Sequence, residues 1–297
     1  MKKVIFLKTP ENFSFRHTVY SHGWCQLAPF ELDEENWRLT YVFGGRKTGT
    51  AVISEDDKGL KIEITGNGDP EKVAADVSHI LRLDEDLEDF YSLACDDIRL
   101  KWVRRANAGR LLRSATVFED LIKTLCTTNC SWGLTKKMVS NFVDKLGQPT
   151  KDGRRTFPAA QALEGLTETF FREEIKAGYR SPYFVKLADK IISGELDPET
   201  WLRSPLTTAE LKKEIKGIKG VGDYAAENLL KLLGRYDGLA LDSWLRSQFY
   251  KKHNREKPCP DKRIEKHYHR FGQWKGLAIW CDLTERWFDE KGMNDQN

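Results

Sequence analysis

The sequence predicts an α+β protein in which a small antiparallel sheet comes first and a helical region follows. Segments rich in β-branched and aromatic residues, divided by turn residues, all lie before residue 67. From about residue 104 onward, apolar residues recur instead at the three- and four-residue spacing of a helix. A chain of 297 residues has room for two domains of ordinary size. We therefore expect a sheet domain over residues 1–103, a helical domain over 104–291 and a tail over 292–297.

The expected sheet has four strands, and hairpin turns at 44–45 (Gly-Gly) and 57–59 (Asp-Lys-Gly) separate the last three of them. The four strands are residues 13–21 (FSFRHTVYS), 37–43 (WRLTYVF), 49–56 (GTAVISED) and 59–66 (GLKIEITG). Two helices, at about 71–83 and 87–94, follow the sheet.

The helical region opens with a capping box, in which Thr116 and Glu119 are spaced to satisfy each other's backbone N–H groups. Further helices are expected at 134–146, at 158–193 with breaks at Gly178 and Pro182, and at 271–288, after a basic stretch at 251–270.

Charge and cysteine content narrow the function classes. The net charge is only +3, so binding to a polyanion requires local clusters such as residues 101–113 (KWVRRANAGRLLR). The alternative for that run is a solvated charged face.

Six scattered cysteines contain no C-x-x-C pair, so no metal site is expected. Without an apolar run long enough for a signal peptide or a membrane span, a cytoplasmic protein with reduced thiols is expected.

Residues 207–234 predict two helices joined by a tight glycine hairpin. Thr207 and Glu210 form a capping box for the first helix, and the second begins near Asp223. Glycines let a ligand approach the backbone and leave the N–H groups of the second helix unpaired, which suits a phosphate oxygen. The hairpin contains Gly217, Gly220 and Gly222, with Lys212, Lys213, Lys216 and Lys219 around it. The alternative is an ordinary helical hairpin with a solvated lysine face.

The segment 211–242 resembles the helix-hairpin-helix motif of the DNA glycosylase superfamily, which includes endonuclease III, 8-oxoguanine DNA glycosylase and the alkylpurine glycosylases. In that family the hairpin reads like residues 218–222 (IKGVG), and a loop then leads to an essential aspartate, here Asp242. Asp242 is also placed to cap the next helix, and both roles are compatible because a capping carboxylate is held rigidly. The resemblance implies that double-stranded DNA is the partner and that Gly217, Lys219, Gly220, Val221 and Gly222 bind it.

Tyr224 bears on the type of reaction. Family members that also cleave the DNA strand carry a lysine at this position, whose amine attacks the sugar carbon and forms a Schiff base. A tyrosine cannot do this, Lys219 faces phosphate in the hairpin, and Lys231 lies two helical turns away. The resemblance therefore implies a monofunctional glycosylase that uses water as its nucleophile.

Three further segments resemble 8-oxoguanine DNA glycosylase. Residues 118–132 (FEDLIKTLCTTNCSW) match a finger inserted at the lesion, with Asn129 at its tip, and residues 177–184 (AGYRSPYF) match a wedge, with Tyr179 and Arg180. Residues 271–283 (FGQWKGLAIWCDL) match the helix that lines the base pocket, which implies that Trp274, Trp280 and Asp282 lie beside Tyr224. The structural alternatives are a cap for Asn129, a helix junction for Tyr179, core packing for the tryptophans and a surface position for Asp282.

A flipped base is the substrate that these groups imply, because a base inside the duplex cannot be reached. Aromatic walls favour a cationic base, and Asp282 would attract one, so we expect an alkylated purine such as 3-methyladenine or 7-methylguanine. The alternatives are an oxidised-purine glycosylase, with or without lyase activity, and a non-catalytic binder of distorted DNA. The cysteine loop of endonuclease III is missing, so no iron–sulfur cluster or other cofactor is expected. The resemblance allows a monovalent cation at the hairpin carbonyls and implies a monomer in the cytoplasm, at the nucleoid.

Overall fold

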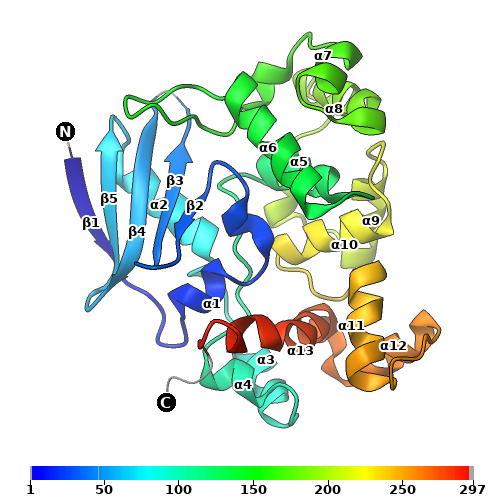
Figure 1. The fold of residues 1–297 in the computed structure, drawn as a ribbon. Helices are drawn as coiled ribbons and strands as arrows, with labels where there is room; N and C mark the ends of the chain where they lie inside the picture. Colours follow the sequence, from blue (N-terminus) through cyan, green and yellow to red (C-terminus); the bar gives the residue numbers. More distant parts are fainter. Residues whose placement is uncertain (1, 46, 294–297) are drawn as a thin grey trace.

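The computed structural model describes residues 2–45 and 47–293. Its five strands form one antiparallel sheet in the order β1-β5-β4-β3-β2 (Figure 1). The strands are β1 (Lys2–Leu7), β2 (Glu31–Asp33), β3 (Arg38–Phe43), β4 (Gly49–Asp56) and β5 (Gly59–Gly66). The β4–β5 hairpin closes at Gly59, whose φ of +115° favours glycine and whose added Cβ would lie 2.4 Å from the Leu7 carbonyl oxygen.

One predicted strand is wrong and two strands were not predicted. Residues 13–21 contain a helix, α1 (Phe15–Val19), capped by Ser14. Phe15 and Val19 are both buried, so these residues follow helical spacing although their type suits a strand. The unpredicted β1 and β2 are the two edges of the sheet. Edge strands are easily missed because their apolar side chains need not alternate with polar ones, and Val4 and Phe6 of β1 are exposed.

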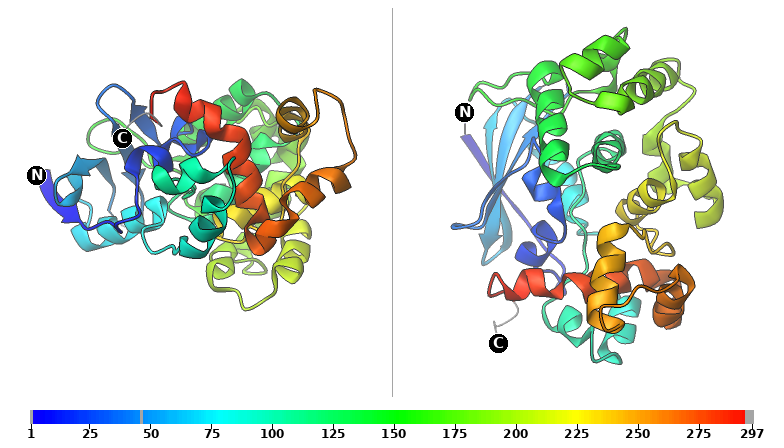
Figure 2. Two further views of the ribbon diagram at one scale, coloured as in Figure 1. Left: turned by 90° about the horizontal axis from the view of Figure 1, so that it is seen from below. Right: turned by 45° about the vertical axis from the view of Figure 1, so that its right-hand side comes forward.

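Thirteen α-helices are described within these two residue ranges, and short 3₁₀ turns join several of them. Besides α1 they are α2 (Pro70–Leu81), α3 (Glu88–Cys95), α4 (Lys101–Arg105), α5 (Val117–Thr127), α6 (Trp132–Leu146), α7 (Glu168–Glu173), α8 (Ser181–Ile192), α9 (Thr208–Lys216), α10 (Asp223–Leu232), α11 (Ser243–His253), α12 (Asp261–Tyr268) and α13 (Lys275–Asp289). The sheet lies along one side of the molecule, and α9, α11 and α12 lie at the other (Figure 2). In the part of the chain that is described, no helix has the length and hydropathy needed to cross a membrane.

The capping predictions differ in outcome. The capping box of Thr207 and Glu210 is complete at the start of α9. Thr116 caps α5, but Glu119 does not return the bond, because its carboxylate accepts from Tyr41 and pairs with Lys123 at 2.6 Å. Pro182, predicted to break a helix, lies in the first turn of α8, where a proline is tolerated.

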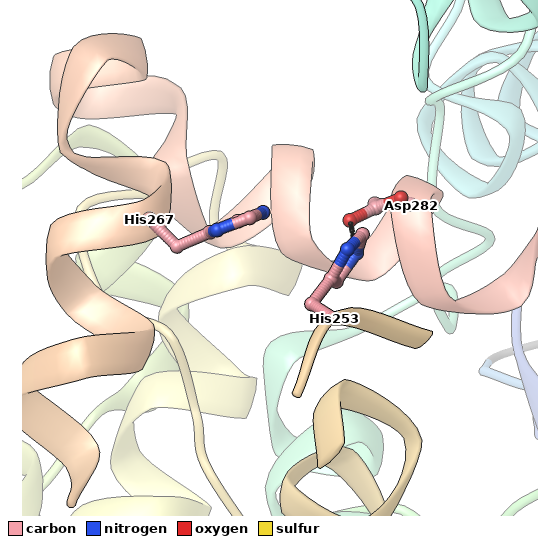
Figure 3. A group of neighbouring side chains, drawn as sticks. All are labelled: His253, His267 and Asp282. Carbon is pink, nitrogen blue, oxygen red and sulfur yellow. Dashed lines mark hydrogen bonds and ion pairs between the residues drawn. The ribbon is translucent and has the colours of Figure 1, made fainter. Parts of the chain in front are cut away.

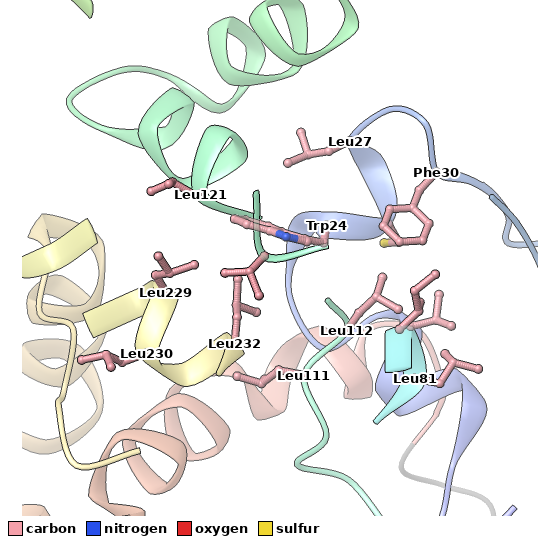
Figure 4. Packing of buried hydrophobic residues seen from close by; sticks show 14 of the residues in the cluster. Trp24, Leu27, Phe30, Leu81, Leu111, Leu112, Leu121, Leu229, Leu230 and Leu232 are labelled. Atoms are coloured by element: carbon pink, nitrogen blue, oxygen red, sulfur yellow. The ribbon is translucent and has the colours of Figure 1, made fainter. Parts of the chain in front are cut away.

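The predicted sheet and helical regions share one buried cluster (Figure 4). Trp24 lies in it between Leu27 and Phe30 on one side and the leucines of α10 on the other. Its indole N–H donates to Asp120 of α5 at 2.7 Å. Of the predicted tail, Gly292 and Met293 are described and Met293 is buried, whereas residues 294–297 lie outside the described residues.

Candidate active site

A cavity of about 660 Å³ lies between the segment 20–26, the α5–α6 turn, α10, the start of α11 and α13. It brings together three residues predicted for the site, Asp242, Tyr224 and Trp280. Its other lining residues include Tyr20, His22, Gly23, Trp24, Cys130, Trp132, Asn228, Lys231, Trp244, Trp287, Glu290 and Lys291. The volume is in the range of small-molecule sites. The cavity is therefore large enough for a purine, and seven tyrosine and tryptophan side chains line it.

Asp242 is both a helix cap and a cavity residue. It is the N-cap of α11, and its carboxylate accepts from the Leu245 N–H at 2.7 Å. The helix dipole favours negative charge at this position. The predicted capping role of Asp242 is confirmed, and the cap fixes its carboxylate at the cavity wall. Its catalytic role stays a prediction.

Tyr224 lies in the first turn of α10, beside Asp242. Burial, followed by the negative charge of Asp242, raises the pKa of the Tyr224 phenol to about 12. The hydroxyl is therefore protonated at neutral pH and can donate a hydrogen bond in the cavity. The amide of Asn228, one turn later, donates to the Tyr224 carbonyl at 2.9 Å.

Lys231 is a cavity residue that was not predicted for the site. It lies seven residues after Tyr224, hence on the same face of α10, and only 2% of it is exposed. Its ammonium donates to the Leu239 carbonyl at 3.2 Å and lies 5.7 Å from the centroid of the Trp280 ring. Burial lowers the pKa of Lys231 to about 8. The helical spacing from Tyr224 was the signal that could have identified this residue.

Three tryptophans form one wall of the cavity. Trp244 lies 6.1 Å from Trp280 and 5.3 Å from Trp287, measured between ring centroids, and Trp280 lies 5.6 Å from Trp287. The indole N–H of Trp280 donates to the Ser21 carbonyl at 2.9 Å, which ties α13 to the N-terminal segment. Trp244 and Trp287 were not predicted, because their meeting depends on how α11 packs on α13.

Trp132 lies on the other side, at the end of the α5–α6 turn. It is 37% exposed, and its indole N–H donates to the Gln26 side chain at 2.9 Å. Gly23 permits this position, since an added Cβ there would lie 2.3 Å from the Trp132 ring. Trp132 is thus an aromatic surface at the cavity that is partly open to solvent.

Two residues predicted for the base pocket do not line the cavity. Trp274 stacks on Tyr236, with ring centroids 5.4 Å apart, and packs near Phe90. Asp282 is only 1% exposed and lies among α11, α12 and α13 (Figure 3). Core packing was the alternative interpretation of Trp274, and it describes the structure, whereas neither interpretation of Asp282 does. A carboxylate at Asp282 does not reach a base held in this cavity.

Asp282 is held by three hydrogen-bonding or charged partners. Its Oδ2 accepts from His253 at 2.6 Å and from the Tyr268 hydroxyl at 2.5 Å, and Oδ1 lies 3.0 Å from the Lys252 ammonium. Burial alone would raise the pKa of Asp282, but the hydrogen bonds from His253 and Tyr268 and the nearby positive charges lower it to about 2. Asp282 is therefore an ionised structural group.

His253, His267 and Asp282 offer metal-ligand atoms within 4.8 Å of one another (Figure 3). Burial, followed by the charges of Arg99 and His253, lowers the pKa of His267 to about 4, so its ring is neutral. However, Arg99 contacts His267 and Lys252 pairs with Asp282, which puts two positive charges where a cation would bind. These contacts identify the cluster as an ion-pair network that holds three helices together.

The glycine hairpin lies between α9 and α10, as predicted. Gly220 has φ +95°, and an added Cβ would lie 2.4 Å from the Tyr183 ring, so this glycine is also required by packing. Gly222 is the N-cap of α10 and has no side chain to cap the helix, and a Cβ added to it would meet nothing within 4 Å. Val221 is buried, so only its backbone can face a ligand. Gly217 ends α9 with ordinary helical φ.

Two of the four hairpin lysines are already neutralised within the protein. Lys212 pairs with Glu227 at 2.5 Å, and both Lys212 and Lys216 lie 3.0 Å from Asp223. Lys213 and Lys219 are exposed and have no ion pair among the residues described. The second basic cluster, at 101–113, does not form a continuous basic surface, because Arg110 and Arg113 are buried.

The predicted finger and wedge lie next to each other. Asn129 is exposed with φ +45°, a conformation that asparagine tolerates. Tyr179 is 48% exposed, and its hydroxyl donates to the Thr128 carbonyl at 3.2 Å. Arg180 is buried and donates to the Thr128 side chain at 3.1 Å, so it braces the finger from behind. Asn129 and Tyr179 are thus presented outward and Arg180 inward.

Comparisons with known proteins identify the fold. No family model and no curated protein sequence matches the chain. Among solved structures, MBOgg1 in complex with a low-affinity DNA ligand matches at TM-score 0.76 and 19% identity, over 97% of this chain and 96% of that one. The apo-form 8-oxoguanine glycosylase/lyase of Clostridium acetobutylicum matches at TM-score 0.74 and 22% identity, over 95% of each chain. The 3-methyladenine DNA glycosylase of Archaeoglobus fulgidus matches at TM-score 0.74 and 19% identity, over 95% and 98%.

Proposed function

We propose that this chain, which has the fold of the helix-hairpin-helix DNA glycosylases, hydrolyses the N-glycosidic bond of a damaged base flipped out of duplex DNA. The observation that carries the proposal is the position of Asp242, a carboxylate fixed by a helix cap at the wall of an aromatic cavity of about 660 Å³. The exposed Asn129, Tyr179 and hairpin N–H groups are suited to contact the duplex around it.

Asp242 would stabilise the positive charge that develops on the sugar as the bond to the base breaks. A fixed carboxylate needs no reorganisation at that moment, and it can also orient the attacking water. The protonated Tyr224 hydroxyl donates beside it and has no amine with which to attack the sugar. The products would be a free base and an intact abasic site, and this hydrolysis requires no redox cofactor.

Two classes of damaged purine are candidates. An alkylated purine, the sequence-based expectation, is favoured by the wall of Trp244, Trp280 and Trp287, because aromatic faces attract a cation. The sequence analysis also expected Asp282 to attract a cationic base, but Asp282 lies outside the cavity. An oxidised purine is favoured by Lys231, a buried ammonium in the same wall that opposes positive charge.

The test is base release from duplexes that carry one lesion in a fixed sequence, with single-turnover rates for the parent protein and for Asp242→Asn. The matched control is Asp69→Asn, which changes an N-cap aspartate of α2 that accepts from the Glu71 N–H at 3.2 Å and does not line the cavity. The proposal requires release by the parent and by Asp69→Asn. If neither releases any of 3-methyladenine, 7-methylguanine, hypoxanthine or 8-oxoguanine, the chain is only a DNA binder.

Borohydride trapping tests the absence of lyase activity. We expect no covalent adduct, because no lysine occupies the position of Tyr224. An adduct that forms with the parent but not with Lys231→Met would identify Lys231 as an amine nucleophile and would contradict the hydrolytic mechanism.

A further inference from the structure

Lys231 is a buried ammonium ion whose hydrogen-bonding capacity the protein uses only in part. An ammonium group has three donors, and the single acceptor recorded for Lys231 is the Leu239 carbonyl, at 3.2 Å. Within residues 2–45 and 47–293, no carboxylate lies at ion-pair distance from it. Burying a charge without partners is costly, so the position calls for an acceptor supplied from the cavity.

The carboxylates nearest to Lys231 are engaged elsewhere. Glu227, one turn earlier on α10, accepts from Lys212 at 2.5 Å and from the Ala240 N–H at 2.6 Å. Asp242 caps α11 with one of its oxygens. Both carboxylates favour the charged form of Lys231 through space, but burial outweighs them and lowers its pKa to about 8.

A thiol and an imidazole near Lys231 are both neutral at physiological pH. Burial raises the pKa of the Cys281 thiol, on α13, to about 12. Burial also lowers the pKa of His22, across the cavity, to about 4. Lys231 is thus a positive charge on the cavity wall that no neighbouring thiolate or imidazolium modifies near pH 7.

The ammonium lies beside the aromatic wall against which a base would stack. Its nitrogen is 5.7 Å from the centroid of Trp280, and both residues line the cavity. A planar base bound against this wall brings its edge close to the ammonium. A carbonyl oxygen or a ring nitrogen on that edge would accept a hydrogen bond, whereas a base with a positive charge would be repelled.

We propose that Lys231 selects the base, by donating to an acceptor of a neutral, carbonyl-bearing purine and by disfavouring a cationic purine. This inference rests on the glycosylase function proposed above. It assigns to that site oxidised or deaminated purines in preference to cationic alkylated purines.

The experiment compares 8-oxoguanine, hypoxanthine and 7-methylguanine in one duplex sequence. Single-turnover excision rates are measured for the parent, Lys231→Met and Lys231→Arg, and the readout is the rate ratio of each neutral base to 7-methylguanine. The ratio should fall about tenfold or more in Lys231→Met, the effect expected for one hydrogen bond to a charged group. Lys231→Arg retains the charge and should keep most of the ratio.

The control is Lys212→Met, which removes a lysine that pairs with Glu227 but does not line the cavity. It should leave the ratio unchanged. In the parent the ratio should also fall between pH 7 and pH 9, as Lys231 loses its proton, and it should not fall in Lys231→Arg. An unchanged ratio in Lys231→Met overturns the proposal. If that variant does not fold, an unchanged ratio in the parent between pH 7 and pH 9 overturns it.

The inference can fail separately from the proposed function. If the parent releases no base, the glycosylase proposal is wrong, and base selectivity is then read from affinity. The affinities of Asp242→Asn and of the double variant Asp242→Asn/Lys231→Met are measured for duplexes that carry the same three lesions. Loss of the preference for the neutral lesions in the double variant supports the role of Lys231, and equal preferences refute it.

Discussion

Lys231 and Asp282 are both buried charged residues, yet their surroundings differ in the way that separates a functional group from a structural one. Asp282 has three partners from two neighbouring helices, α11 and α12, and its charged form is stabilised. Lys231 has one carbonyl, faces a cavity, and has its charged form destabilised. A buried charge that its own protein satisfies holds elements together, whereas one left unsatisfied at a cavity is available to a ligand.

The largest expected effect is on stability, at Asp282. Asp282→Ala leaves the His253 and Tyr268 donors without their buried carboxylate, and breaking a buried pair costs about 3–5 kcal/mol. Urea unfolding of the variant and the parent measures this loss. Because Asp282 does not line the cavity, the excision rate per folded molecule should stay within about twofold of the parent. A variant that is stable but excises cationic purines slowly would indicate that Asp282 belongs to the base pocket after all.

The pH dependence of the same group gives a second measurement. Its pKa of about 2 in the folded protein lies below its ordinary value of 3.8, so its stabilisation is present above about pH 4 and is lost as pH falls to 2. Asp282→Asn should therefore show a weaker loss of stability than the parent over this acid range.

Asp242 should show the opposite combination. Asp242→Asn can still cap α11 but lacks the charge that opposes the sugar cation, so excision should slow by on the order of 10²–10³, about 3–4 kcal/mol. Unfolding in urea should change by less than about 1 kcal/mol, the usual scale for a cap. Equal excision rates for the variant and the parent would show that Asp242 acts only as a helix cap.

Replacing Lys231 should stabilise the protein. Its pKa of about 8 lies below the ordinary 10.5, so the burial of its charge costs stability below pH 8, and this cost disappears as pH rises toward 10.5. Lys231→Met should be more stable than the parent at pH 7 by roughly 3 kcal/mol, with a smaller difference at pH 10. Urea unfolding at the two pH values checks this. A less stable variant at pH 7 would mean that Lys231 is satisfied within the protein.

The contrast between these residues also explains what the sequence could predict. The hairpin and Asp242 lie within one continuous segment, where spacing fixes geometry locally, and their positions were predicted. The tryptophan wall and Lys231 depend on how α10, α11 and α13 meet the segment 20–26, which no local pattern encodes. Asp282 was misjudged for the same reason, because its helix was identified but the face directed to the cavity was not. Residues 13–21 were misread because residue type favoured a strand where burial follows a helix.

The smallest effect is expected at the hairpin. Of its four lysines, Lys212 and Lys216 are already paired with a carboxylate of the protein. Lys219→Ala should lower the slope of log affinity against log salt on lesion-free duplex by up to about 1, the amount expected for one lost phosphate contact. Lys216→Ala is the matched control: because Lys216 pairs with Asp223 at 3.0 Å, its charge is already neutralised within the protein, and its removal should change the slope less than removal of Lys219. The base ratios defined for Lys231 should not change in either variant, because neither lysine lines the cavity. Equal affinities and slopes for Lys219→Ala and the parent would exclude this lysine from the DNA interface. Changed base ratios would show that the surface that binds the duplex and the wall that selects the base are not separate.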